Sequence, residues 1–284
     1  MISVFANFRI NNKTRLELFK LSFNSIKDDS NFDNWVINCR GDYKIQVENI
    51  LRESLGERLI FSSNESKKGW FYDSSKMIKN LKNNFVFFWI EDHVKISAHF
   101  INSSELKNLE KNEVDYLQYS FTHSNRFKSL RPFIDGEDSK FKYYSINKEN
   151  TENLNDKIYI VSVVGLFSKL FFKKIISTNH PILKRWPRNT PFDFEKTNND
   201  KLFLPIKIAL PKSELFACID DDHGVDNYSL VSRGLINLNP ELRESLIIEE
   251  NKEMLSSKYT FLKYTPKFLK QIYRIIVRIK YTYF

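Results

Sequence analysis

NFVFFWIEDH, residues 84–93, predicts a strand that is buried on both faces and ends in charged groups. Residues 85–90 are apolar without a break, a run too short to cross a membrane and typical of the interior of a parallel sheet. Glu91, Asp92 and His93 follow at once. Two carboxylates and an imidazole at the carboxyl end of a strand can hold a divalent cation, and the cation can hold a phosphate. A solvated charged turn is the simpler alternative.

Three strand-like runs alternate with three helix-like runs upstream of this stretch. The strands are expected at 2–8, 35–38 and 58–61, and the helices at 14–26, 45–55 and from Ser74 or Ser75 to Leu81, with Thr14 as the cap of the first. Alternation at this spacing predicts parallel strands joined by right-handed crossovers. We therefore expect an α/β protein with a Rossmann-like, mostly parallel central sheet flanked by helices.

Polar residues follow each of the four expected strands. They are Asn7 and Arg9, then Asn38, Arg40 and Asp42, then Asn64 and Lys67, and finally residues 91–93. The carboxyl ends of parallel strands meet at one edge of a sheet, so these groups should gather there, and a nucleotide could lie across them. Neither the glycine-rich dinucleotide motif nor a phosphate-binding P-loop motif is present.

The second half of the chain is less regular. A helix is expected at 103–117, irregular or hairpin-like structure at 118–157, a strand at 158–164 and a helix at 165–176. Three prolines favour a loop over 180–195, and 202–210 and 214–219 are expected to be extended. A second cluster of acids and an imidazole, residues 220–223, ends this last run.

In this order the motifs resemble the GT-A glycosyltransferases, and in layout the family 2 group of bacterial surface-polysaccharide enzymes. The resemblance rests on FVFFWI before Glu91–His93, on residues 186–195 and on residues 222–230, and it covers about residues 1–236. It implies a GT-A-like catalytic domain at 1–240, with a nucleotide-sugar-binding half (1–100) and an acceptor half (101–240), followed by an extension at 241–284.

The resemblance also implies roles for particular residues. Asp92, with Glu91 or His93, would hold Mn²⁺ or Mg²⁺ on the donor diphosphate, and His223 could add a ligand. Asp193 or Glu195 would be the general base, with the alternative that both cap the segment that follows. Trp186 and Arg188 would meet the acceptor. Arg233 could pair with a donor phosphate, although an ordinary surface ion pair is as good an interpretation.

The C-terminal stretch predicts an amphipathic helix with a cationic edge. Its apolar positions recur at helical spacing from Phe268 to Ile279, and its basic residues are Lys263, Lys267, Lys270, Arg274 and Arg278. Such a helix suits an anionic membrane surface, to which each basic residue contributes about 1 kcal/mol. A helix packed on the domain and a helix bound in a partner's groove are the alternatives.

Charge and cysteine content limit the partners. The net charge is +9, and residues 258–280 hold seven Lys or Arg and no acid, so a nucleic-acid surface over the whole protein is not expected. Cys39 and Cys218 lack metal-ligand spacing and fit a reducing compartment. The start of the chain carries no signal-peptide pattern. We expect a cytoplasmic protein at the inner face of the cell membrane.

The sequence therefore predicts a glycosyltransferase that uses a nucleotide sugar and a divalent cation. By resemblance, the acceptor would be a glycan or polyprenyl-linked glycan, and transfer would invert the anomeric centre, with a retaining enzyme as the alternative. A nucleotidyltransferase is less favoured, because residues 6–11 lack the glycine-rich loop typical of that class. A non-enzymatic module that binds a membrane or single-stranded nucleic acid through the basic, tyrosine-rich tail is the rival from another class.

Overall fold

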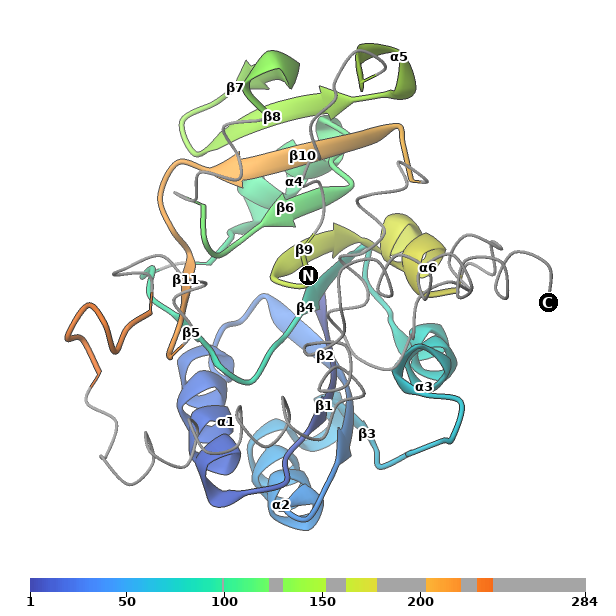
Figure 1. The fold of residues 1–284 in the computed structure, drawn as a ribbon, viewed down its shortest axis with the longest axis vertical. Coiled ribbons are helices and arrows are strands. Elements are labelled where there is room, and N and C mark those ends of the chain that lie inside the picture. Colours follow the sequence, from blue (N-terminus) through green and yellow to red (C-terminus); the bar gives the residue numbers. More distant parts are fainter. Residues whose placement is uncertain (99, 123–129, 152–161, 178–202, 221–228, 237–284) are drawn as a thin grey trace, which may run out of the picture.

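The computed structural model describes residues 1–98, 100–122, 130–151, 162–177, 203–220 and 229–236 (Figure 1). Within these ranges the core is one nine-stranded sheet in the order β3-β2-β1-β4-β9-β6-β10-β8-β7. A two-stranded sheet, β5 with β11, lies beside it. The proposed nucleotide-sugar and acceptor halves therefore share a continuous sheet, because β4 of the first half pairs with β9 of the second.

The first half confirms the expected alternation of strands and helices. It runs β1 (Ile2–Arg9), α1 (Lys13–Ile26), β2 (Phe32–Arg40), α2 (Lys44–Leu55), η1 (Gly56–Arg58), β3 (Leu59–Ser62), α3 (Trp70–Met77), η2 (Ile78–Asn80) and β4 (Phe85–Phe88). Strands β3, β2, β1 and β4 are parallel neighbours, as predicted. All four residues of β4 are buried, because helices cover both faces of the sheet.

The second half adds antiparallel pairs. It runs β5 (His93–Lys95), α4 (Ser103–Lys111), β6 (Tyr116–Gln118), β7 (Ile134–Glu137), β8 (Phe141–Ile146), α5 (Lys148–Thr151), β9 (Gly165–Ser168), α6 (Lys169–Ser177), β10 (Ile206–Pro211) and β11 (Phe216–Cys218). Strand β9 is antiparallel to both β4 and β6, whereas β6 and β10 are parallel. The hairpin of β7 and β8 confirms the hairpin-like interpretation of this region.

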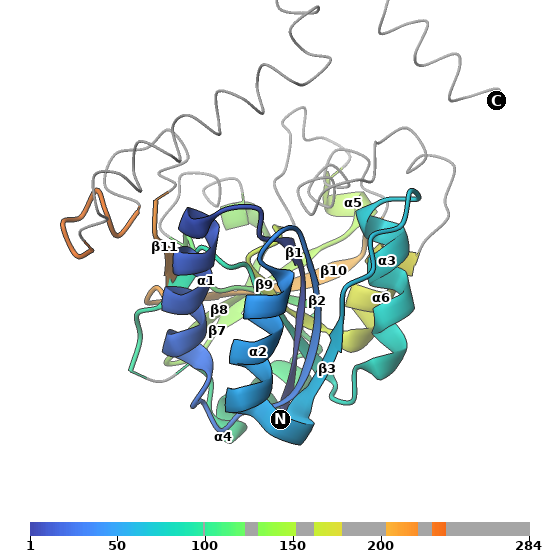
Figure 2. The ribbon, with the colours of Figure 1, turned by 90° about the horizontal axis from the view of Figure 1, so that it is seen from below.

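Helices α1 and α2 cover one face of the parallel strands, and α3 and α6 cover the other (Figure 2). Aromatic rings fill the layer under α1. The indole of Trp89 lies 5.5 Å from the rings of Phe8 and Phe19, 5.8 Å from Trp35 and 5.9 Å from Phe23, measured between centroids. These contacts fix the segment that leads from β4 to Glu91–His93 against α1.

Two helix starts differ from the sequence prediction. The side chain of Asn12, not Thr14, caps α1 by accepting the N–H of Arg15 at 2.7 Å. Helix α3 begins at Trp70 rather than at Ser74 or Ser75, because the Trp70 side chain is buried and its indole N–H donates to the carbonyl of Asn7 at 2.6 Å. Tertiary packing, not local polarity, sets this start.

The strand expected at 158–164 is also placed differently. Residues 158–161 lie outside the described residues, 162–164 are not extended into a strand, and β9 begins at Gly165, where a helix was expected. A Cβ atom at Gly165 would lie 2.0 Å from the ring of Tyr116, so glycine permits β9 to pair closely with β6. Helix α4 ends at Lys111, and β6 occupies the end of the expected 103–117 helix.

Candidate active site

The charged groups that follow β4 lie near the carboxyl ends of β1 and β4. The chain leaves β1 toward β2 on one side, whereas β4 lies on its other side, so this is the point where strand order reverses and where ligands bind in open α/β sheets. The side chain of Arg15, in the first turn of α1, extends to the residues that follow β4. Its Nη1 lies 3.4 Å from Oε1 of Glu91 and 3.6 Å from Oδ2 of Asp92.

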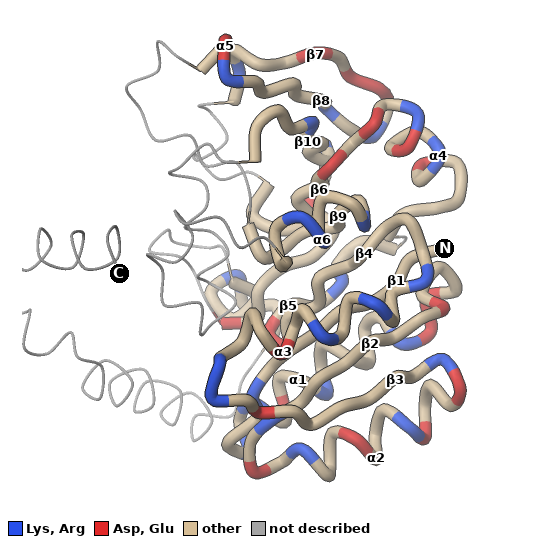
Figure 3. The backbone as a smooth tube through the Cα atoms, turned by 90° about the vertical axis from the view of Figure 1, so that its right-hand side faces the viewer, with Lys and Arg blue, Asp and Glu red and all other residues tan. Residues whose placement is uncertain are grey.

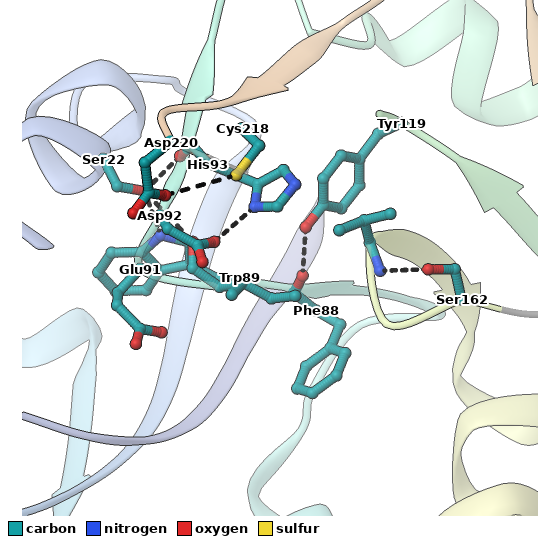
Figure 4. Close-up of polar contacts among 12 residues, drawn as sticks. Ser22, Phe88, Trp89, Glu91, Asp92, His93, Tyr119, Ser162, Cys218 and Asp220 are labelled. Carbon is teal, nitrogen blue, oxygen red and sulfur yellow. Dashed lines mark hydrogen bonds and ion pairs between the residues drawn. The ribbon is translucent and has the colours of Figure 1, made fainter. Parts of the chain in front are cut away.

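Asp92 is tied to its neighbour His93 (Figure 4). Oδ1 of Asp92 lies 2.7 Å from Nδ1 of His93. Burial by itself would raise the pKa of Asp92, but the hydrogen bond and charge of His93 and the charge of Arg15 outweigh burial and lower the pKa. Asp92 is therefore a carboxylate at neutral pH, as a cation ligand must be.

Glu91 responds in the opposite direction. Burial is the main cause that raises its pKa, and the adjacent charges of Asp92 and Asp220 add to it, while Arg15 acts against them. Two successive carboxyl groups thus have pKa values displaced in opposite directions. Pairs of acids with opposed pKa shifts are frequent at functional sites. Burial and neighbouring charges there keep one group ionised and favour the protonated form of the other, so that the two can take different roles.

Cys218 joins this cluster across the small sheet. Strand β11 pairs with β5 so that Cys218 is opposite His93. The ligand atoms of Asp92, His93 and Cys218 all lie within 4.8 Å of one another, and the Cys218 thiol donates to Oδ1 of Asp220 at 3.8 Å (Figure 4). The sequence prediction missed Cys218, since its cysteine spacing gave no signal and only strand pairing brings it to His93.

A chain of two hydrogen bonds ties the backbone carbonyl of His93 to Ser22 of α1. The indole N–H of Trp89 donates to Ser22 Oγ at 2.8 Å, and Ser22 Oγ in turn donates to the carbonyl of His93. Nε2 of His93 is buried and has no hydrogen-bond partner among the described residues, and its ring meets Phe121 edge-on at 5.6 Å between centroids. A buried polar atom without a partner requires a physical explanation.

The set of atoms fits a divalent cation. A carboxylate oxygen, an imidazole nitrogen and a thiol sulfur are ligands of zinc and similar transition metals, whereas magnesium prefers oxygen ligands alone. The predicted ligands Asp92 and His93 thus lie together, and His223 lies outside the described residues.

Asn7 and Asn38, predicted to contact the donor, are buried and hydrogen-bond to each other. Nδ2 of Asn38 donates to Oδ1 of Asn7 and to the carbonyl of Asn64, both at 2.9 Å. Oδ1 of Asn38 accepts from the N–H of Asn64 at 2.8 Å, and Nδ2 of Asn7 donates to Ser74 Oγ at 2.8 Å. These amides hold the loop before α3 against the sheet, which the sequence prediction did not anticipate.

Arg9 and Arg40 are opposite each other in the register of β1 and β2. Arg9 pairs with Glu65, and Nε of Arg40 is buried without a hydrogen-bond partner among the described residues. Burial and then the charge of Arg9 lower the pKa of Arg40. Gly41 permits the close approach of this turn, because its φ is +96° and a Cβ there would lie 2.5 Å from the Ile10 carbonyl oxygen.

The other predicted site residues are spread more widely. Asp42, Asn64 and Lys67 are exposed along the same edge. Arg233 pairs with Glu214 at 2.8 Å, so it takes part in the ion pair that the alternative interpretation offered. Asp193, Glu195, Trp186, Arg188 and the basic residues Lys263, Lys267, Lys270, Arg274 and Arg278 lie outside the described residues.

Comparisons with known proteins find similar solved structures but no family. No family model matches the chain, and no curated protein matches it either. Solved structures of S. aureus TarS are similar: one at 14% identity and a TM-score of 0.47 over 76% of this chain and 36% of TarS, and one with UDP-GlcNAc at 15% and 0.46 over 76% and 57%. A TarS structure with UDP is similar at 15% identity and a TM-score of 0.47, over 96% of this chain and 77% of that one. These likenesses concern the arrangement of sheet and helices.

The described helices include none that is both long enough and apolar enough to span a bilayer.

Proposed function

We propose that this chain is a glycosyltransferase that moves a sugar from a nucleoside-diphosphate sugar to a glycan acceptor. The observation that supports it most is the meeting of Asp92, Glu91 and Arg15 at the carboxyl edge of the sheet, next to the point where strand order reverses. The pKa values of the two carboxyl groups are shifted in opposite directions there, and the ligand set of Asp92, His93 and Cys218 lies beside them. The order of motifs along the sequence supports the same class.

The chain's own groups suit the needs of sugar transfer. Asp92 and His93, with Cys218 beside them, would hold a divalent cation, whose chemistry is to neutralise the charge of the leaving diphosphate. The guanidinium group of Arg15 pairs with Glu91 and Asp92 and orients their carboxyl groups. Asp193 or Glu195 is the proposed base for the acceptor hydroxyl.

The remaining features of the proposal come from the resemblance. The acceptor would be a polyprenyl-linked glycan of a surface polysaccharide, and transfer would invert the anomeric centre. The basic tail, Lys263 to Arg278, would hold the enzyme at the inner face of the membrane. Trp186 and Arg188 would contact the acceptor, and Arg9, Arg40, Asp42, Asn64, Lys67 and Arg233 the donor.

A thermal-shift screen tests the donor class. Purified protein would be heated with UDP-, GDP-, CMP- and dTDP-sugars, with and without Mn²⁺ or Zn²⁺. A ligand that binds only the folded state raises the midpoint temperature by mass action. We expect one nucleotide class to stabilise the protein, more strongly with metal, and to lose this effect in Asp92→Asn. No shift with any nucleotide sugar in either metal would contradict the proposal.

A further inference from the structure

The helices on the two faces of the sheet differ in charge. Six exposed lysines lie on α3, on α6 and on the residues that flank α3: Lys68, Lys76, Lys79, Lys82, Lys173 and Lys174. The one acid in residues 66–82 and 169–177 is Asp73, which is 3% exposed. We name this surface the α3–α6 face; Figure 3 views the molecule from this side.

The lysines of the α3–α6 face have no ion pair with any described residue. The other helical layer differs, because there Lys20 pairs with Glu17 at 2.8 Å and Arg52 with Glu48 at 2.7 Å. Like charges on one face repel one another, and a partner that brings negative charge relieves that repulsion. One of these lysines, Lys174, also acts on Asp115, where its charge opposes the burial that raises the pKa of that carboxyl group. The α3–α6 face therefore suits an anionic partner, whereas ion pairs within α1 and within α2 neutralise part of the charge of the other layer.

Apolar side chains stand among these lysines. Leu170, in the first turn of α6, is 83% exposed, and Tyr72 on α3 is 36% exposed. Nζ of Lys68 and Nζ of Lys76 lie 4.7 Å and 5.0 Å from the centre of the Tyr72 ring. A leucine gains by leaving water, and a tyrosine ring flanked by cations suits the headgroup level of a bilayer. A soluble polyanion would use the lysines but would give Leu170 no apolar surroundings.

We propose that the α3–α6 face docks on an anionic lipid surface. The lysines meet the lipid phosphates, and Leu170 and Tyr72 enter the headgroup layer. The inference rests on the charges and exposure of this face and is independent of the transferase proposal. It adds a surface of the globular domain to the tail from which the sequence predicted membrane attachment.

Vesicle flotation of the full chain tests the proposal, using phosphatidylcholine with and without phosphatidylglycerol. The test variant replaces Lys76, Lys79, Lys173 and Lys174 with Gln. Each lysine near an anionic surface contributes about 1 kcal/mol, or about fivefold in partition, so the four together should reduce binding on the order of several hundredfold. Leu170→Ser should reduce it by about tenfold. All these side chains are exposed, so the variants should unfold at the wild-type temperature.

The matched control removes the same charge from the α1–α2 layer, with Lys13, Lys20, Lys44 and Arg52 replaced by Gln. We expect it to retain vesicle binding within about threefold, since its charges do not meet the lipid surface. Equal loss in both variants, or no loss in the α3–α6 variant, would overturn the proposal and leave binding to the tail. Wild-type binding by Leu170→Ser, together with lysine-dependent capture of an oligonucleotide, would assign the face to a soluble polyanion instead.

Discussion

Two stretches of the same sheet edge use polar side chains in opposite ways. Near the carboxyl ends of β1 and β2, Asn7 and Asn38 donate and accept within the protein, and their amides hold the loop before α3. After β4, the pKa values of Glu91 and Asp92 are shifted in opposite directions, and Nε2 of His93 has no hydrogen-bond partner among the described residues. The difference teaches that position at a strand end does not by itself make a binding residue. A neutral amide that finds partners becomes structural, whereas clustered charges keep capacity for a ligand.

The largest expected effect is a loss of sugar transfer when the residues after β4 are changed. Asp92→Asn keeps the shape of the side chain but removes the charge, and we expect sugar transfer to fall by about 10²–10³-fold because a charge-stabilising group is lost. The control is Asp28→Asn, an exposed acid at the other end of α1, which should leave the rate unchanged. Transfer kinetics with the donor identified in the thermal-shift screen measure both. Wild-type turnover in Asp92→Asn would remove the charged stretch from the mechanism.

Asn38→Ala should lower the stability of the fold rather than act on sugar transfer directly. The side chain is fully buried, and its loss leaves the Asn7 oxygen and the Asn64 backbone groups without partners. We expect the free energy of unfolding to fall by about 2–4 kcal/mol, measured by urea denaturation. Asn49→Ala, at an exposed position of α2, should change it by less than about 0.5 kcal/mol. A stable Asn38→Ala protein that no longer binds the donor would make Asn38 a binding residue and erase the contrast.

A metal titration compares the two cysteines, because Cys218 belongs to the candidate ligand set and Cys39 does not. Cobalt(II) bound to a thiolate absorbs in the near ultraviolet, and we expect that band on titrating the wild-type protein. Cys218→Ser should abolish it and weaken metal binding by about 10–100-fold, whereas Cys39→Ser should retain it. Cys39 is the matched control, since it is also buried and burial raises the pKa of its thiol to about 12. A cobalt band that survives Cys218→Ser would exclude sulfur from the site.

The smallest expected effect is a pH dependence of stability. Because the pKa of Glu91 is raised above its ordinary value of 4.5, the native state binds its proton more tightly than the unfolded state, and stability falls as pH rises above that value. Glu91→Gln should therefore raise the midpoint temperature at pH 7 by about 2–4 °C and have no effect below about pH 4.

Asp92→Asn should show the opposite sign. The pKa of Asp92 is lowered from 3.8, so its charge contributes stability that is present above this value and lost as pH falls through the lower, native pKa. The variant should melt at a lower temperature than wild type at pH 7. Calorimetric scans from pH 3 to pH 8 measure both variants, and shifts of the same sign in the two would contradict the opposed pKa values.

Much of the parallel core was predictable because hydrophobic pattern and turn chemistry agree there. The runs predicted as strands at 2–8 and 85–90 correspond closely to β1 and β4, and residues 91–93 lie at the carboxyl edge of the sheet as expected. The N-cap Asn12 of α1 and the start of α3 at Trp70 were missed. For α3, a distant contact with the Asn7 carbonyl outweighs the local preference of Ser74. Strand β9 was missed because the close approach of Tyr116, which leaves no room for a side chain at Gly165, exists only in the folded protein.

The sequence by itself determined the fold class, the buried strand and the acids and imidazole that follow it, since these depend on residues close together in the chain. Tertiary structure alone decided which polar groups are used within the fold and which remain available to bind a ligand. It joined Asn7 to Asn38, brought Cys218 to His93 through the pairing of β11 with β5, and set α3 beside α6 so that their lysines share a face. Hydrogen-bond partners and charge neighbours are set by three-dimensional distance, and a linear pattern carries no information about a partner dozens of residues away.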